Sequence, residues 1–330
     1  MSFKRLDQED IVVSAESVTG PVWSGNVTTL SQFFTSSAQS TSQFYLDVFQ
    51  TGSGEAGAAV QFSIAYCDKG GSGSVLFNSA VTDKSPTAVN FNTYRNLVNG
   101  DEDTDISFDG VSSSYFYAIS FDRARYREKL LPGTFQLTLS SSEGALVLAD
   151  DGLNANTISY TDAGRVYNIV KTSPGPTTAS IAGTGSWGLL LPDIGTVLLN
   201  GPMLDKATNG EGGVNLGTIR GGNTANHNER KLYDVIKTGA SFQMKFEETI
   251  SSNFVFIRSR NSEFNYSTNP SYITGSGEVR HEIMIDDPRA YFTTVGLYND
   301  NNDLLAVAKL SRPLLKDSRK EALVRIKLDY

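Results

Sequence analysis

The sequence of 330 residues is poor in the side chains that form disulfides and bind metals. It contains one cysteine, Cys67, and two histidines, His227 and His281. A single cysteine excludes an intrachain disulfide. One cysteine and two histidines cannot build a structural zinc site without several carboxylates or a second chain. The composition therefore excludes zinc fingers and most zinc enzymes.

Positive charge and long apolar runs are also scarce. Lysine and arginine total 28 against 36 aspartates and glutamates, so the net charge is -8. Nucleic-acid binding normally needs a basic surface, so we expect no nucleic-acid partner. The longest apolar stretch, near residues 187–204, is interrupted by Pro192 and Asp193 and is too short for the ~18 to 20 residues of a membrane span. The first ten residues lack the apolar segment of a secretory signal, so we expect cytoplasmic synthesis and no membrane partner.

Hydroxyl, glycine and aromatic residues are abundant. The chain contains 37 serines, 28 threonines, 30 glycines, 18 phenylalanines and 14 tyrosines. Aromatic residues separated by turn-forming residues are typical of short strands and not of helices. We therefore predict a mainly β protein, with antiparallel β-sandwich or barrel-like regions, long glycine-rich loops and one or two short helices.

Residues 1–150 are predicted to form an N-terminal β-sandwich-like region. In residues 59–67 the side chains alternate, with Val60, Phe62, Ile64 and Tyr66 on one face. Such alternation predicts a half-buried strand. Similar patterns predict further strands at residues 43–50, 114–121 and 135–140, and residues 51–57 resemble a hairpin loop.

Residues 151–250 are predicted to form a loop-rich middle region with one helix. Two long loops are expected at residues 172–186 and 209–228. Asn226 is a candidate N-cap, with Glu229 completing a capping box, and Gly239 is a candidate C-terminal stop. The apolar stripe of this helix is Leu232, Val235 and Ile236. A second short helix is expected at residues 123–131.

Residues 251–330 are predicted to form a C-terminal β region. Strands are expected at residues 253–260, 290–298 and 304–310, with a turn at residues 299–303. The last seven residues alternate regularly, so we also expect a strand that runs to the end of the chain.

Two stretches match the spacing of a dinucleotide-binding loop, G-x-G-x-x-G. They begin at Gly52 and Gly183. The dinucleotide interpretation requires a helix directly after the loop. A predicted strand follows Gly57, and Leu-Leu-Leu-Pro follows Gly188, so we interpret both stretches as ordinary loop glycines.

The remaining candidate sites are also incomplete. Asp101, Asp103 and Asp105 begin like a calcium loop, but its sixth position is not glycine and its twelfth is not glutamate. Cys67 lies on a strand face and is expected to be a buried, inert thiol. The other candidates are His227, His281 and the adjacent pair Asp286 and Asp287, all of which we interpret as ordinary polar residues. We therefore expect no catalytic, cofactor-binding or metal-binding residue, and no enzyme activity.

The densest positive patch is the run Arg123, Arg125, Arg127 and Lys129. It predicts either a solvated face or a docking patch for an acidic neighbour. The net negative charge argues against a nucleic-acid site there.

Four segments of the C-terminal third are VFIRSRNSEFNYSTNP at residues 255–270, YFTTVGLYND at 291–300, LLAVAKLSRP at 304–313 and IKLDY at 326–330. They resemble segments of structural proteins of tailed phages, especially T4-like myoviruses that infect cyanobacteria. Residues 43–64 and 115–139 share this resemblance. It implies a virion protein of the tail or baseplate, made in the host cytoplasm, and carries no site residues.

The resemblance and the composition together predict a non-enzymatic structural subunit of a virion. Its expected partners are other virion proteins, in homo- and hetero-oligomeric contacts. One alternative is a host-surface glycan-binding module, suggested by the many tyrosines, Trp23 and Trp187. Another is a wall-degrading hydrolase, for which the sequence offers no acid and base pair.

Overall fold

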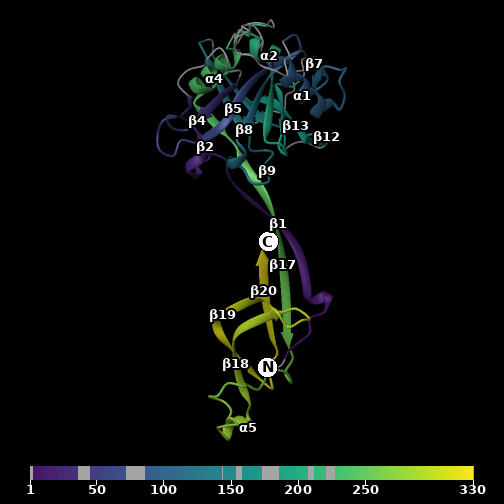
Figure 1. The fold of residues 1–330 in the computed structure, drawn as a ribbon, viewed down its shortest axis with the longest axis vertical. Coiled ribbons are helices and arrows are strands. Elements are labelled where there is room, and N and C mark those ends of the chain that lie inside the picture. Colours follow the sequence, from purple (N-terminus) through teal and green to yellow (C-terminus); the bar gives the residue numbers. More distant parts are fainter. Residues whose placement is uncertain are drawn as a thin grey trace. The chain divides into compact units, whose positions relative to one another are not determined.

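A computed structural model describes residues 3–35, 45–71, 86–142, 144–153, 158–172, 186–206, 212–220 and 227–329. The chain divides into two compact units (Figure 1). The large unit is Val18–Glu248, and the small unit combines Met1–Ser17 with Thr249–Tyr330. Both units are mainly β, which confirms the predicted fold class.

The large unit is built on one antiparallel sheet of twelve strands. Its order is β2-β16-β10-β11-β13-β14-β15-β8-β5-β4-β3, with β12 paired to β13. Strands from both sides of residue 150 therefore share one sheet. The bounds are Thr29–Leu30 (β2), Phe34–Thr35 (β3), Tyr45–Phe49 (β4), Val60–Asp68 (β5), Tyr115–Phe121 (β8), Gln136–Ser141 (β10), Gly144–Asp150 (β11), Ser159–Thr161 (β12), Gly164–Thr172 (β13), Gly188–Leu191 (β14), Thr196–Asn200 (β15) and Ser241–Gln243 (β16).

The sheet curls because its two end strands are neighbours in the sequence. Only residues 31–33 separate β2 at one end of the sheet from β3 at the other. An extended chain covers at most about 3.6 Å per residue, so this link spans no more than about 15 Å. Eleven strands spaced about 4.8 Å apart would separate the ends of a flat sheet by about 48 Å. The sheet must therefore bend into a half-barrel.

The inner face of the curl is filled by helix α4 (Asn228–Gly239) and by aromatic rings. This helix contacts β10 and β16 near one end of the sheet and β4 and β5 near the other. The ring of Trp23 lies 4.9 Å from the ring of Phe242 and 5.5 Å from that of Phe121, measured between centroids. Leu232 and Ile236 of the helix are fully buried in the same cluster.

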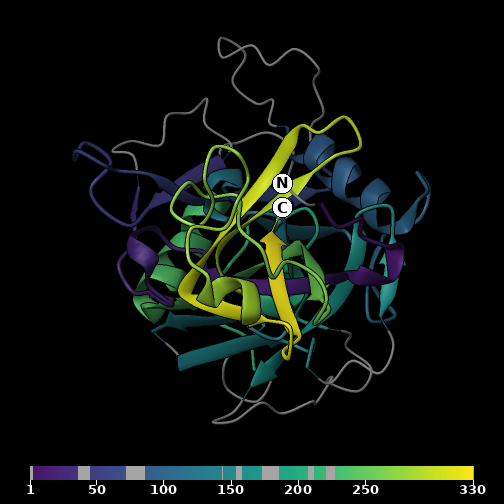
Figure 2. The same cartoon turned by 90° about the horizontal axis from the view of Figure 1, so that it is seen from below.

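The outer face is covered by helix α1 (Thr87–Asn99). Alternate residues of β8 divide between the two faces: Tyr117 and Ile119 belong to the inner cluster, and Phe116 and Ala118 pack with Phe91 of α1 in the outer one. Figure 1 and Figure 2 show α1 and α4 on opposite sides of the large unit. Because both faces of β8 are covered, its seven residues are almost uniformly apolar.

The helices differ from expectation in number and position. The structure describes four helices, where one or two were predicted: α1, α4, α2 (Gly201–Asp205) and α5 (Ile283–Asp286). Within 123–131 it has a short 3-10 turn at Arg123–Arg125 and the strand β9 (Lys129–Leu130) in place of a helix. The apolar stripe of α4 is confirmed, but the residue before its first turn is His227.

Asn226 lies outside the described residues, as do 173–185 and 209–211 of the expected loops.

The small unit contains a hairpin and long strands. The hairpin consists of β18 (Arg289–Tyr298) and β19 (Leu304–Asp317), joined by the predicted turn. Strand β17 (Lys245–Ser259) pairs with β20 (Ala322–Asp329) from Ser252 to Ser259, and with β1 (Ile11–Pro21). The first residues of β17 belong to the large unit and pair there with β9, the fourth strand of this sheet. The predicted strands of the C-terminal region are thus confirmed.

Among the described residues, no helix combines the length and the apolar character that a membrane crossing requires.

Candidate functional site

The histidines and the cysteine do not form a nucleophilic site. His227 lies in the large unit, and His281 is exposed in the small unit. The Nδ1 atom of His227 lies 3.9 Å from a carboxylate oxygen of Glu229. Cys67 is fully buried in the outer cluster. Burial, with the nearby Asp68 charge, raises the pKa of the Cys67 thiol, so the reactive thiolate is disfavoured.

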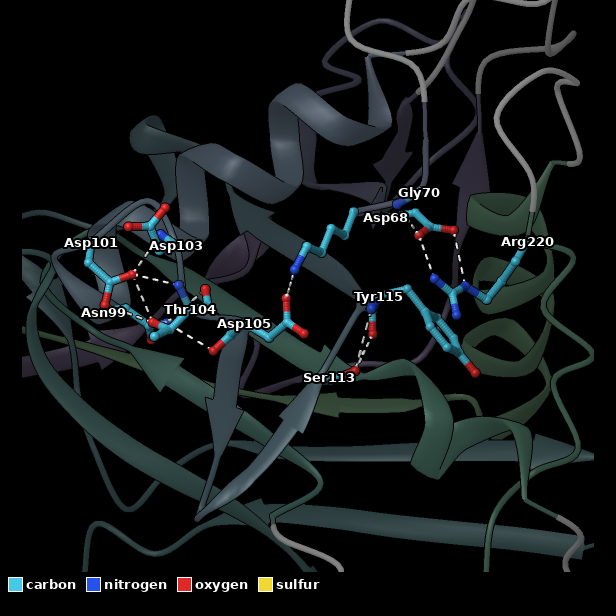
Figure 3. Close-up of polar contacts among 11 residues, drawn as sticks. Asp68, Gly70, Asn99, Asp101, Asp103, Thr104, Asp105, Ser113, Tyr115 and Arg220 are labelled. Carbon is cyan, nitrogen blue, oxygen red and sulfur yellow. Dashed lines mark hydrogen bonds and ion pairs between the residues drawn. The ribbon is translucent and has the colours of Figure 1, made fainter.

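The acidic loop after α1 is held together by its own hydrogen bonds (Figure 3). One carboxylate oxygen of Asp101 accepts the backbone N–H of Asp103 at 3.0 Å and that of Thr104 at 2.8 Å. These hydrogen bonds, chiefly those of Thr104, lower the pKa of Asp101. Asp105 forms an ion pair with Lys69 at 2.6 Å. Protein donors therefore occupy the carboxylates of Asp101 and Asp105, two of the three that suggested a calcium loop.

The pair Asp286 and Asp287 lies at the end of the short helix α5. Asp287 accepts hydrogen bonds from Arg289, and these lower its pKa. Arg319 approaches the same carboxylate to 3.9 Å. A carboxyl with a lowered pKa stays ionised at neutral pH, so Asp287 is unsuited to serve as a general acid.

The basic run is paired with neighbours in its own unit. Arg125 donates a hydrogen bond to the Ser24 hydroxyl. The guanidinium of Arg127 lies 2.8 Å from the Glu248 carboxylate, and the Lys129 ammonium lies 3.7 Å from Glu247. These contacts neutralise much of the charge that an acidic partner would need.

The glycine motifs have structural roles where they are described. The loop from Gly52 to Gly57 joins β4 and β5, and a strand follows it. Gly188 lies in β14, where a Cβ atom would approach the Leu198 carbonyl oxygen to 2.2 Å. Close strand packing therefore requires glycine at position 188. Gly183 and Gly185 lie outside the described residues.

The two tryptophans that suggested glycan binding are both core residues. Trp23 is 2% exposed and Trp187 is 1% exposed. A sugar ring stacks on an accessible aromatic face, so neither indole can act in this way. The exposed aromatic residues of the described part of the chain are instead Phe3, Phe34 and several tyrosines, of which Tyr160 of the large unit is the most exposed.

A polar cluster at one end of β5 and β8 was not predicted. The buried Asp68 carboxylate accepts the hydroxyl of Tyr66 at 2.8 Å and the guanidinium of Arg220 at 2.9 and 3.3 Å. The same guanidinium stacks over the Tyr115 ring, 4.7 Å from its centroid (Figure 3). The Tyr115 hydroxyl in turn donates to Asp205 at 2.8 Å.

This cluster anchors the segment 212–220 and offers no evident reacting group. Asp205 also accepts the backbone N–H and the hydroxyl of Thr218. Burial raises the pKa of Tyr66 and of Tyr115, so both phenols remain protonated. Arg220 is 152 residues from Asp68 in the sequence, so no local pattern could have revealed their contact.

Comparison of the chain with models of protein families, with curated proteins and with solved structures finds no match.

The small unit has the most unusual surface of the protein. It holds about a third of the described residues. It contains only five of the fifty buried apolar residues among them, yet it contains fourteen of the 22 large hydrophobic side chains that are exposed. Large exposed apolar areas mark interaction surfaces in soluble proteins. The fourteen side chains are Phe3, Ile11, Val12, Val13, Tyr266, Ile283, Ile285, Tyr291, Tyr298, Leu304, Leu305, Val307, Leu314 and Leu323.

Proposed function

We propose that this chain is a non-enzymatic structural subunit of a tailed-phage virion, located in the tail or baseplate, that acts through contacts with other subunits. The observation that carries the subunit role is the exposed apolar surface of the small unit. Burying one large apolar side chain stabilises an assembly by roughly 1.5 to 3 kcal/mol. A partner that covers several of the fourteen side chains therefore gains enough free energy to form a lasting contact.

The virion assignment rests on the phage-like segments. Residues 255–270, 291–300 and 304–313 belong to the small unit, which also carries the apolar surface. The resemblance and the surface therefore concern the same part of the chain. A structural role also agrees with the polar groups described above, which pair with one another and present no set of reacting groups.

The proposal is tested by cross-linking mass spectrometry on density-purified particles of the phage that encodes the chain. We expect the chain in the particles, with cross-links from Lys309 and Lys320 of the small unit to other subunits. Lys237 of the large unit, which is also exposed, serves as the comparison and should give fewer such links. A chain found in infected-cell lysate but absent from purified, infectious particles would overturn the proposal.

A further inference from the structure

The outer edge of β19 has no partner strand within the described residues. Strand β19 pairs with β18 on one side only, in a sheet of two strands. An exposed edge presents unpaired backbone donors and acceptors, to which another extended strand can add. Most residues of β19 from Leu304 to Leu314 are exposed, so this edge is open to a partner.

The solvent-facing side chains near the start of β19 are apolar. Leu305 is 67% exposed and Val307 is 58% exposed, while Ala306, Ala308 and Leu310 are more buried. Leu304 is also exposed because the pairing is irregular opposite Tyr298. Long exposed apolar edges are usually avoided in proteins that remain monomeric.

Charged residues of opposite sign flank this apolar segment. Asp303 precedes it, Lys309 follows it, and neither forms an ion pair among the described residues. When two copies of one strand pair antiparallel about a two-fold axis through Ala306, residue 303 lies opposite 309 and residue 305 opposite 307. Asp303 of each copy then lies beside Lys309 of the other copy, so one dimer contains two such pairs of opposite charge.

The charge of the small unit also permits copies to approach one another. Residues 1–17 and 249–330 contain 13 lysines and arginines against 14 aspartates and glutamates. A surface with almost no net charge does not repel a second copy. Most of the net charge of -8 consequently belongs to the large unit.

We propose that the chain forms a two-fold dimer in which β19 pairs antiparallel with β19 of a second copy, with Ala306 on the axis. The two hairpins then form one four-stranded sheet, and Leu305 of each copy packs beside Val307 of the other. Cross-strand apolar pairs and opposite charges both stabilise antiparallel pairing. This inference rests on the proposed function, because it names one partner of the same surface.

The first test is cysteine cross-linking of the full-length chain. Directly opposed residues in an antiparallel pair have Cα atoms about 4.5 to 5.5 Å apart, which a disulfide can bridge. Ala306→Cys should therefore give a covalent dimer under mild oxidation, visible on a non-reducing gel. Ser311→Cys is the control: it lies five residues from the axis and after the irregularity that follows Lys309, so its two copies would not lie opposite each other and it should remain monomeric. The native Cys67 is buried and should not react.

The second test is charge reversal measured by sedimentation velocity. Lys309→Glu should weaken dimerisation about tenfold, because it replaces two attractive pairs by two repulsive ones. Asp303→Lys in the same chain should restore it. Lys320→Glu makes the same charge change at an exposed position outside β19 and should have no effect.

The outcomes separate this inference from the proposed function. A wild-type chain that remains monomeric up to about 100 μM, with no Ala306→Cys dimer, would overturn the two-fold pairing and leave the virion role standing. Equal cross-linking through cysteines at residues 306 and 311 would also overturn the pairing with Ala306 on the axis. So would a dimer whose dissociation constant does not change when the charge at residue 309 is reversed. Absence of the chain from particles would overturn the virion role alone.

Discussion

At the scale of single residues, Glu229 is a buried carboxylate whose ionisation should affect stability. Its side chain lies near the start of α4, and burial raises its pKa. Glutamate in an unfolded chain titrates near 4.3. Because the folded pKa is higher, unfolding becomes easier as pH rises from about 4 through that folded pKa. Below about pH 4 the side chain is protonated in both the folded and the unfolded state, so its burial no longer lowers the free energy of unfolding.

We therefore predict that Glu229→Gln raises the free energy of unfolding at pH 7. The gain should vanish near pH 4. Urea denaturation at both pH values measures it. The matched control is Glu102→Gln, which changes the charge equally at an exposed position. A loss of stability at pH 7 would mean that the carboxylate makes a contact which outweighs its burial.

At the scale of elements, the C-terminal strand β20 completes a sheet within its own chain. Val324 pairs with Ile257 and Ile326 with Val255, and the side chains of Val255, Val324 and Ile326 are the buried centre of the small unit. Leu323 projects to the other side and is 65% exposed. The predicted alternation of the last residues is therefore confirmed: one face of β20 is buried in the small unit, and the other face is exposed.

The two faces of β20 should respond differently to truncation of their side chains. Ile326→Ala should lower the free energy of unfolding of the small unit by about 2 kcal/mol, since it removes buried methyl groups from a small core. Leu323→Ala should change it by less than about 0.5 kcal/mol. Denaturation followed by a probe in the small unit would measure both. Equal effects would show that β20 is covered on both faces.

At the scale of the whole molecule, the two units differ in buried apolar surface. Of the fifty buried apolar residues in the described part of the chain, the large unit holds 45 and the small unit holds five. Apolar burial is the main favourable contribution to folding. We predict that hydrogen exchange at backbone amides is slowest in β5 and β8, and faster in β18 and β19 when the chain is dilute.

The same hydrogen-exchange measurement at high protein concentration provides the control. In concentrated solution β19 should gain protection, because pairing with a second copy engages its free edge, whereas β5 and β8 should not change. Protection in β18 and β19 as strong as in β5 at every concentration would show that the small unit is stable without a partner.

Local pattern was sufficient to predict eight of the twenty strands in the described part of the chain. Residues 59–67, 114–121 and 290–298 correspond to β5, β8 and β18 because alternation and strand length are properties of neighbouring residues. Helix α1 was missed because its sequence is rich in asparagine and threonine, which are poor helix formers. Pro86 directly before the helix and Gly100 directly after it are residue types common at helix starts and ends, and they could have indicated its bounds.

Composition and periodicity act over short distances along the chain, and they were enough to predict a mainly β protein without an intrachain disulfide. They also showed that its one cysteine and two histidines cannot build a structural zinc site without several carboxylates or a second chain. The tertiary structure decided which apolar residues are covered. Trp23 and Trp187 enter the core, while Leu305 and Val307 stay exposed, although all four are hydrophobic. Burial depends on strands far apart in sequence, so no local pattern distinguishes a core residue from a docking residue.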